Sequence, residues 1–214
     1  MSNFEYIIAS LPYLTLDFKY PGQTGFNSVI SDIKRDLDER DAELLDFLLK
    51  GFDEKELTAD FYAKALRCRN KFLREYFRFD LNVRNAKVRY LNAQLGREPD
   101  MDVMTGEDPD SPDVDIDGFR FNGGEFEEEA RVDAILAGSD LVTRERELDD
   151  LLWVKIDSLA TFHYFDIEAV LAYVAKLHVV TRWLNLDEEV GRDRFRRLLK
   201  DVRGTYKGVM YDDK

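Results

Sequence analysis

The strongest helical signal runs from Thr58 to Leu95, a stretch of 38 residues that contains neither glycine nor proline. Its apolar residues recur at steps that keep them on one face of an α-helix: Tyr62, Leu66, Leu73, Phe77, Leu81, Val88, Leu91 and Leu95. An unbroken helix of this length would extend about 57 Å. Thr58 is a candidate N-cap, Gly96 ends the stretch, and a kink near 79–80 is the alternative to a straight helix.

Similar spacing predicts helices on both sides of this stretch. The predicted ranges are 26–37, 40–50, 125–137, 143–161, 166–186 and 188–203. Gly51 is a plausible helix stop, Ser139 or Asp140 is a candidate cap, and Asp166 is a good N-cap. We therefore predict an all-α fold of about seven helices in two layers.

The first layer is predicted at 1–97 and the second at 125–214, joined by an acidic loop at 98–124 and packed as one compact domain. A loop of about this length is either mobile or functional. Near the N-terminus, Tyr6-Ile7-Ile8-Ala9 is short and apolar, and Pro12 follows it. We interpret these four residues as a short strand or a short buried element.

Composition narrows the class of protein. The 214 residues are 44% hydrophobic, enough for a sizeable core, and the net charge of −13 disfavours nucleic acid as a partner. The one cysteine, Cys68, precludes an internal disulfide and suits a cytoplasmic protein. No stretch approaches the roughly 20 apolar residues of a membrane span. Membrane association, at the inner membrane, would then be peripheral and through protein contacts.

The charge is unevenly distributed along the chain. Ten basic residues against two acidic ones between Lys64 and Arg97 give +8, and thirteen acidic residues against one basic between Glu98 and Glu129 give −12. Either the acidic stretch partly neutralises the basic helix, or the basic face binds an acidic partner. Our candidate partner-binding residues are Arg67, Arg74, Arg78, Arg84, Lys87, Arg182 and Trp183.

The acidic stretch contains an incomplete calcium loop, DVDIDGFRFNGG, at 113–124. Asp113, Asp115 and Asp117 match the first half of an EF-hand loop, but position 12 is Gly124 rather than glutamate. Arg120 occupies position 8, and the preceding DPDSP segment cannot form the entering helix. These departures favour a solvated acidic loop, and a calcium sensor or metal-dependent enzyme is the third-ranked hypothesis.

No other motif indicates catalysis. The sequence contains no phosphate-binding loop, dinucleotide-binding, nucleophile-elbow or zinc-protease signature. His163 and His178 lack Cys or His partners at zinc-ligand spacing, so we interpret both as packed or boundary residues. Cys68 has no histidine nearby in the sequence that could act as a base. We therefore predict a protein that is not an enzyme and has no cofactor.

Three stretches together resemble a family of uncharacterised bacterial proteins, best known in Bacteroidetes, whose genes lie among those of a V-type ATPase. The stretches are YIIASLP with Leu14 and Leu16, FDLNVRN at 79–85, and FHYFDIEAVLAY at 162–173 with Arg182-Trp183. The family in turn resembles the helical protein that connects the rotor stalk to the membrane ring in V/A-type ATPases. That connector is longer, with three helical repeats where this chain has room for about two.

The resemblance implies a non-catalytic subunit or assembly factor of a V-type ATPase, involved in ion transport and bound to stalk and membrane-ring subunits. The alternative is a helical adaptor that binds an acidic protein or RNA through the basic helix at 64–97. RNA affinity would fall steeply with salt, which separates these two hypotheses.

Overall fold

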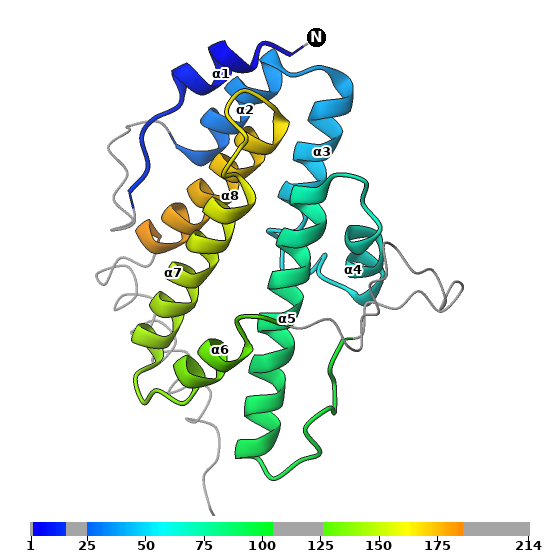
Figure 1. The fold of residues 1–214 in the computed structure, drawn as a ribbon, viewed down its shortest axis with the longest axis vertical. Helices are drawn as coiled ribbons and strands as arrows, with labels where there is room; N and C mark the ends of the chain where they lie inside the picture. The colour runs from blue at the N-terminus through cyan, green and yellow to red at the C-terminus, as the bar shows by residue number, and fades with distance from the viewer. Residues whose placement is uncertain (1, 16–24, 105–125, 186–214) are drawn as a thin grey trace, which may run out of the picture.

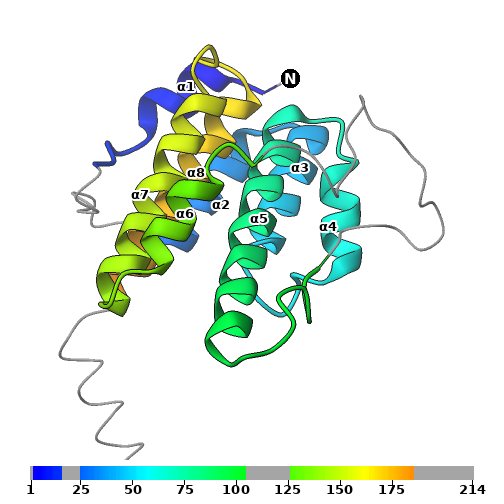
Figure 2. The same ribbon diagram turned by 60° about the horizontal axis from the view of Figure 1, so that its bottom comes forward.

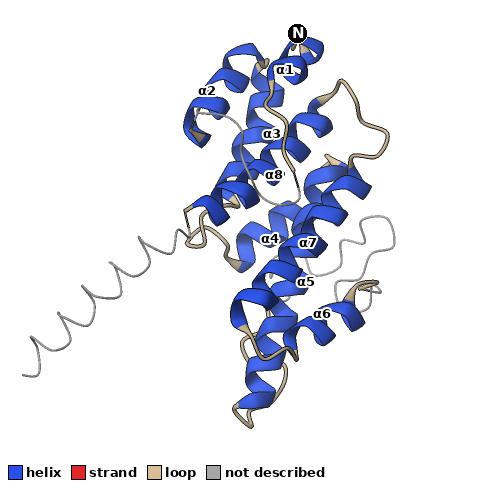
Figure 3. Ribbon diagram, turned by 90° about the vertical axis from the view of Figure 1, so that its left-hand side faces the viewer, coloured by secondary structure: helices blue, strands red, loops and turns tan. Residues whose placement is uncertain are grey.

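The computed structural model describes residues 2–15, 25–104 and 126–185, and within these ranges the chain is all-α with eight helices and no strand (Figures 1 and 3). The predicted fold class is confirmed. The helices are α1 (Phe4–Ser10), α2 (Phe26–Asp36), α3 (Glu39–Lys50), α4 (Ala59–Leu66), α5 (Lys71–Gln94), α6 (Glu129–Leu136), α7 (Leu141–Leu159) and α8 (Ile167–Leu184). None of these helices is both long and apolar enough to cross a bilayer.

The array is organised around α5, α7 and α8. Helices α7 and α8 form an antiparallel hairpin, and α5 runs beside them, with α6 packed against both α5 and α7 (Figures 1 and 2). Helices α1, α2 and α3 all contact α8, while α4 packs on α5. The first three helices therefore pack on the α7–α8 hairpin through contacts with α8.

Two apolar cores hold the array together. The larger core draws buried residues from α1 to α5 and from α7 and α8, including Tyr62, Phe72, Phe77 and Leu171. The smaller core joins the second half of α5 to α6 and α7. Since α8 contributes a near-continuous set of buried residues along its length, it is the most completely enclosed helix in the described part of the chain.

Most helix starts are fixed by local side-chain chemistry. Six helices begin at a residue whose side chain accepts a hydrogen bond from the first turn: Asn3, Asp38, Thr58, Asn70, Asp140 and Asp166. The caps predicted at Thr58, Asp140 and Asp166 are confirmed. Gly51 is the C-cap of α3, as expected.

The N-terminal strand prediction is wrong, because residues 6–9 lie inside α1. The Asn3 side chain accepts a hydrogen bond from the Tyr6 backbone N–H at 3.2 Å, which starts the helix. Phe4, Ile8 and Leu11 then pack against the larger core, a spacing that suits a helix rather than a strand. The helix ends at Leu11, which is extended before Pro12.

The prediction of one helix from 58 to 95 is also wrong. Helix α4 ends at Leu66 and α5 begins at Lys71, so the interruption lies at 67–70 rather than near 79–80. Asn70 is extended, and its side chain accepts from the Leu73 backbone N–H at 3.0 Å. An asparagine that caps a new helix thus ends the old one without glycine or proline.

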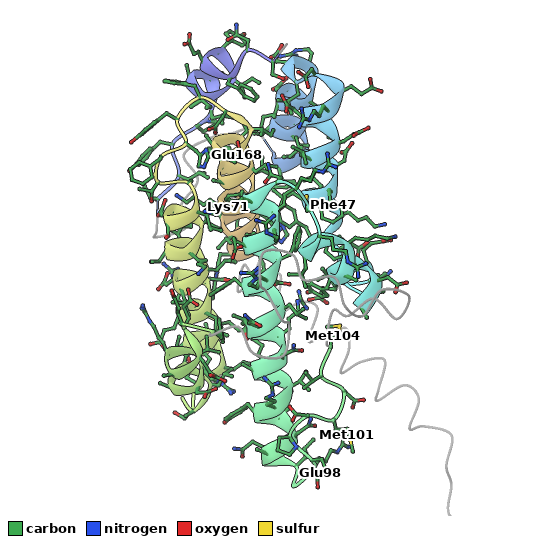
Figure 4. All side chains as sticks on the ribbon, turned by 45° about the vertical axis from the view of Figure 1, so that its right-hand side comes forward. Phe47, Lys71, Glu98, Met101, Met104 and Glu168 are labelled. Atoms are coloured by element: carbon green, nitrogen blue, oxygen red, sulfur yellow. The ribbon has the colours of Figure 1, made fainter. Side chains whose placement is uncertain are left out.

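The predicted apolar stripe fails at its C-terminal end, where Leu91 and Leu95 are exposed. The buried polar residues in this half of α5 are Asn85 and Asn92. The Asn92 amide donates to the carbonyls of residues 99 and 101 at 3.1 and 2.7 Å, and Asn85 exchanges two hydrogen bonds with the Met104 backbone. Residues 98–104 therefore turn back along α5, as Figure 4 shows at Glu98, Met101 and Met104.

The remaining helix predictions differ from the structure at their ends. The ranges 125–137, 143–161 and 166–186 correspond to α6, α7 and α8, whose bounds shift by up to four residues. The predicted helix at 188–203 lies outside the described residues.

Candidate functional site

Most basic residues of α5 are paired with acidic side chains of the same chain. Arg78 pairs with Glu75 at 2.9 Å and Arg84 with Asp80 at 2.9 Å, both within the helix. Lys87 binds Glu145 of α7 at 2.9 Å, and Arg89 binds Asp100 at 2.8 Å. Four of the five predicted partner-binding residues before α6 thus have ion-pair partners, since Arg74 also lies 3.8 Å from Glu75. Among the described residues, the pair between Arg89 and Asp100 links this helix to the acidic stretch.

Two predicted residues of this group, Arg67 and Arg74, belong to the α4–α5 junction. Arg67 is the C-cap of α4 and is half-buried. Arg74 donates from Nη1 to the Cys68 carbonyl at 2.9 Å, so its guanidinium helps to fold the junction. The structure brings neither residue into a common surface with Lys87, which faces α7.

Arg182 and Trp183 converge on a buried carboxylate. Trp183 Nε1 donates to Asp149 Oδ2 at 2.6 Å, and the Arg182 guanidinium pairs with the same oxygen. The Asp149 side chain is only 5% exposed, and this burial raises its pKa, although Arg182 and Trp183 act in the opposite direction. These two predicted partner-binding residues therefore link α8 to α7.

Three exposed aromatic residues lie in the turn between α7 and α8. Phe162, Tyr164 and Phe165 are 85%, 66% and 60% exposed. We name residues 162–165 the aromatic turn. It lies at the same end of the array as α1, whose Tyr6 is also exposed (Figures 1 and 3). Such a group of large apolar side chains is typical of an interaction surface.

Hydrogen bonds fix the aromatic turn at both ends. The backbone N–H of His163 donates to the Ala160 carbonyl at 2.9 Å, and Asp166 caps α8 through the Ala169 N–H at 3.0 Å. In the first turn of α8, Glu168 accepts from the Asn70 amide at 2.9 Å, beside Lys71 and the start of α5 (Figure 4). The exposed rings are thus presented from a well-connected backbone.

His163 lies inside this turn between two carboxylates. Its Nδ1 is 2.6 Å from Asp166 Oδ2 and 4.0 Å from Glu168 Oε2. The three ligand atoms lie within 4.8 Å of one another, and they form the one group of His, Cys, Asp and Glu side chains in the described ranges that is close enough together to hold a metal ion. The near-miss calcium residues Asp113, Asp115 and Asp117 lie outside the described residues.

His178 lines a second feature, an open groove of about 830 Å³ between α2, α8 and the segment after α3. Its ring stacks on Phe52 at 3.9 Å between centroids and contacts Phe26 edge-on at 6.2 Å. Burial lowers the pKa of His178 to about 4, so the imidazole is neutral at physiological pH. It acts as a packed aromatic side chain.

Comparison with known families identifies the chain. The model of a family described as "Protein of unknown function (DUF2764)" matches residues 52–205, more than two thirds of the 214 residues. The chain belongs to the DUF2764 family. A search of curated proteins and a search of solved structures each found no match. The DUF2764 match covers α4 to α8, and therefore contains the aromatic turn and the contact of Arg182 and Trp183 with Asp149, here named the Asp149 cluster.

Neither the Asp149 cluster nor the exposure of the aromatic turn is predicted by the sequence. The signal for the turn was present, because Phe162 and Phe165 lie between two helical stripes and belong to neither. Asp149 gave no signal, since its neighbours Glu147 and Asp150 are acidic too and only the fold shows which carboxylate is buried.

Proposed function

We propose that this DUF2764 protein is a non-catalytic subunit or assembly factor of a V-type ATPase that docks to stalk or membrane-ring subunits through the aromatic turn. The observation that carries the docking surface is the exposure of Phe162, Tyr164 and Phe165 on a hydrogen-bonded turn. The choice of partner rests on the resemblance of three sequence stretches to proteins encoded among V-type ATPase genes. Association with the inner membrane would be peripheral, through these protein contacts.

The energetics suit a protein partner. Burying a Phe or Tyr side chain contributes about 1.5–3 kcal/mol, and aromatic residues are enriched among those that dominate binding at protein interfaces. The turn is already held by the cap of α8 and by the α7 backbone, so little ordering would accompany docking. Three such side chains on one turn are sufficient to anchor an interface.

The alternative of an acidic or RNA partner on the basic helix is less favoured. Arg78, Arg84, Lys87 and Arg89 each pair with a carboxylate of this chain. A partner would have to replace these pairs rather than neutralise free charges, and exchanging one ion pair for another yields little net energy.

The test is affinity purification of the tagged chain from its own cells in mild detergent, followed by mass spectrometry. We expect near-stoichiometric recovery of the ATPase nucleotide-binding and stalk subunits. A Phe162→Ser/Tyr164→Ser variant should lose them. Both side chains are exposed, so its melting temperature should stay close to that of the parent.

A control variant removes two exposed apolar side chains elsewhere. Leu141 and Val142 at the start of α7 are 62% and 64% exposed, at the opposite end of that helix from the aromatic turn. A Leu141→Ser/Val142→Ser variant should retain the subunits. Recovery of no ATPase subunit from an extract with intact complex would overturn the choice of partner. Retention of the subunits by the aromatic variant would overturn the surface.

A further inference from the structure

We propose that His163, Asp166 and Glu168 form a binding site for a divalent transition-metal ion of the zinc class. The site lies at the base of the aromatic turn, and it does not depend on the ATPase partner. Its ligands would be His163 Nδ1, Asp166 Oδ2 and Glu168 Oε2, which face one another across the start of α8.

Two of the three separations between the ligand atoms are close to what a metal requires. Ligands at about 2.0–2.2 Å from a tetrahedral ion lie roughly 3.3 Å from one another. Nδ1 of His163 is 2.6 Å from the Asp166 oxygen and 4.0 Å from the Glu168 oxygen. A shift of the imidazole by about 0.7 Å, away from Asp166 and toward Glu168, would bring both separations near that value. The half-exposed side chains have room for this shift.

The other oxygen of each carboxylate is already engaged. Asp166 Oδ1 accepts the capping hydrogen bond from the Ala169 N–H at 3.0 Å. Glu168 Oε1 accepts from the Asn70 side-chain amide at 2.9 Å, which reaches it from the start of α5. Outer hydrogen bonds of this kind orient metal-ligating carboxylates and leave one oxygen of each directed at the ion.

The ligand set indicates the class of ion. Calcium and magnesium prefer oxygen ligands to an imidazole nitrogen. One imidazole with two carboxylates suits zinc and other first-row divalent ions. A metal here would join the aromatic turn to the first turn of α8. Its fourth position would remain open to water or to a partner.

The test uses the full chain without an affinity tag and Zn²⁺ as the probe. The chain has two histidines, so NMR of the ring protons resolves both. We expect Zn²⁺ to shift the His163 signals and leave those of His178 in place, since His178 is stacked on Phe52. Mg²⁺ and Ca²⁺ should shift neither. An unmoved His163 signal, or one that Mg²⁺ moves equally, would overturn the site.

Calorimetry of variants identifies the ligands. His163→Gln, Asp166→Asn and Glu168→Gln should each weaken Zn²⁺ binding at least tenfold, and Asn at 166 preserves the helix cap. The Asn70→Ser variant keeps the cap of α5, but its serine side chain should be too short to reach Glu168. We therefore expect its affinity for Zn²⁺ to fall by about 10–100-fold. Asp157→Asn, an exposed carboxylate at the end of α7, is the control and should bind like the parent. Equal affinity of the parent and the His163 variant would contradict the assignment.

Discussion

Replacing Arg182 with alanine should destabilise the fold through Asp149 rather than through lost packing. The Asp149 side chain is 5% exposed and that of Arg182 is 45% exposed. Removing one partner of a buried ion pair costs about 3–5 kcal/mol. Because the guanidinium is nearly half exposed, water can partly replace it. We therefore expect the variant to lose about 2–3 kcal/mol of unfolding free energy, less than a fully buried pair would cost. At about 2–4 °C per kcal/mol for a chain of this size, the melting temperature should fall by about 4–12 °C.

The loss should depend on pH in a defined direction. Burial raises the pKa of Asp149, so the folded state takes up this proton at a higher pH than the unfolded state, whose carboxyl titrates near about 3.9. Stability from this group is therefore gained as pH falls through the raised folded pKa. Without Arg182 the pKa should rise further, and the deficit of the variant should be largest at neutral pH and shrink in acid.

Urea unfolding of four proteins checks this reasoning: the parent, Arg182→Ala, Asp149→Asn and the double variant. An Asn carboxamide still accepts from Trp183 Nε1 and carries no charge, so the double variant should be more stable than Arg182→Ala alone at pH 7. Additive losses in this double-mutant cycle, or a deficit of the Arg182 variant that is the same at pH 7 and pH 5, would refute the argument.

Two further predictions concern the larger core. Gly51→Ala should cost about 1–3 kcal/mol by overpacking, because its Cβ would lie 2.3 Å from the Phe77 ring, whereas Gly25→Ser, with nothing within 4 Å, should lose nothing in urea unfolding. The His178→Leu variant should lose less unfolding free energy than the parent as the pH falls from 7 to 4.5. The folded pKa of about 4 lies below the unfolded value of about 6.5, so the parent loses up to about 3 kcal/mol as pH falls between them. An equal acid loss in both proteins, measured by urea unfolding at pH 7 and 4.5, would contradict this.

The features that the sequence predicted correctly are local. Thr58, Asp140 and Asp166 cap their helices because a side chain and an N–H three residues later suffice, whatever the fold. Up to its last turn, the apolar spacing of α8 likewise corresponds to buried residues: Ile167, Val170, Leu171, Val174 and Leu177. Helical periodicity is informative where one face of a helix is buried and the other faces solvent.

The features that it missed depend on distant contacts. Leu91 satisfies the helical spacing, but α5 extends beyond its neighbours there, and Asn92 is buried instead because residues 99–101 return to meet it. From the sequence, Lys87 has the character of a free charge, but in the fold it pairs with Glu145 of α7, which is 58 residues away along the chain. Neither pairing has a signal in the local sequence.

The interruption between α4 and α5 also determines where the aromatic turn lies. Asn70 uses its carbonyl oxygen to cap α5 and its amide nitrogen to hold Glu168 of α8. In a continuous helix from 58 to 95, Asn70 would sit mid-helix, its backbone N–H bonded within the helix and its side chain directed away from the Leu73 N–H. The contact between α5 and the first turn of α8 would then be lost. The same asparagine that ends one helix therefore positions the surface and the metal site that we propose.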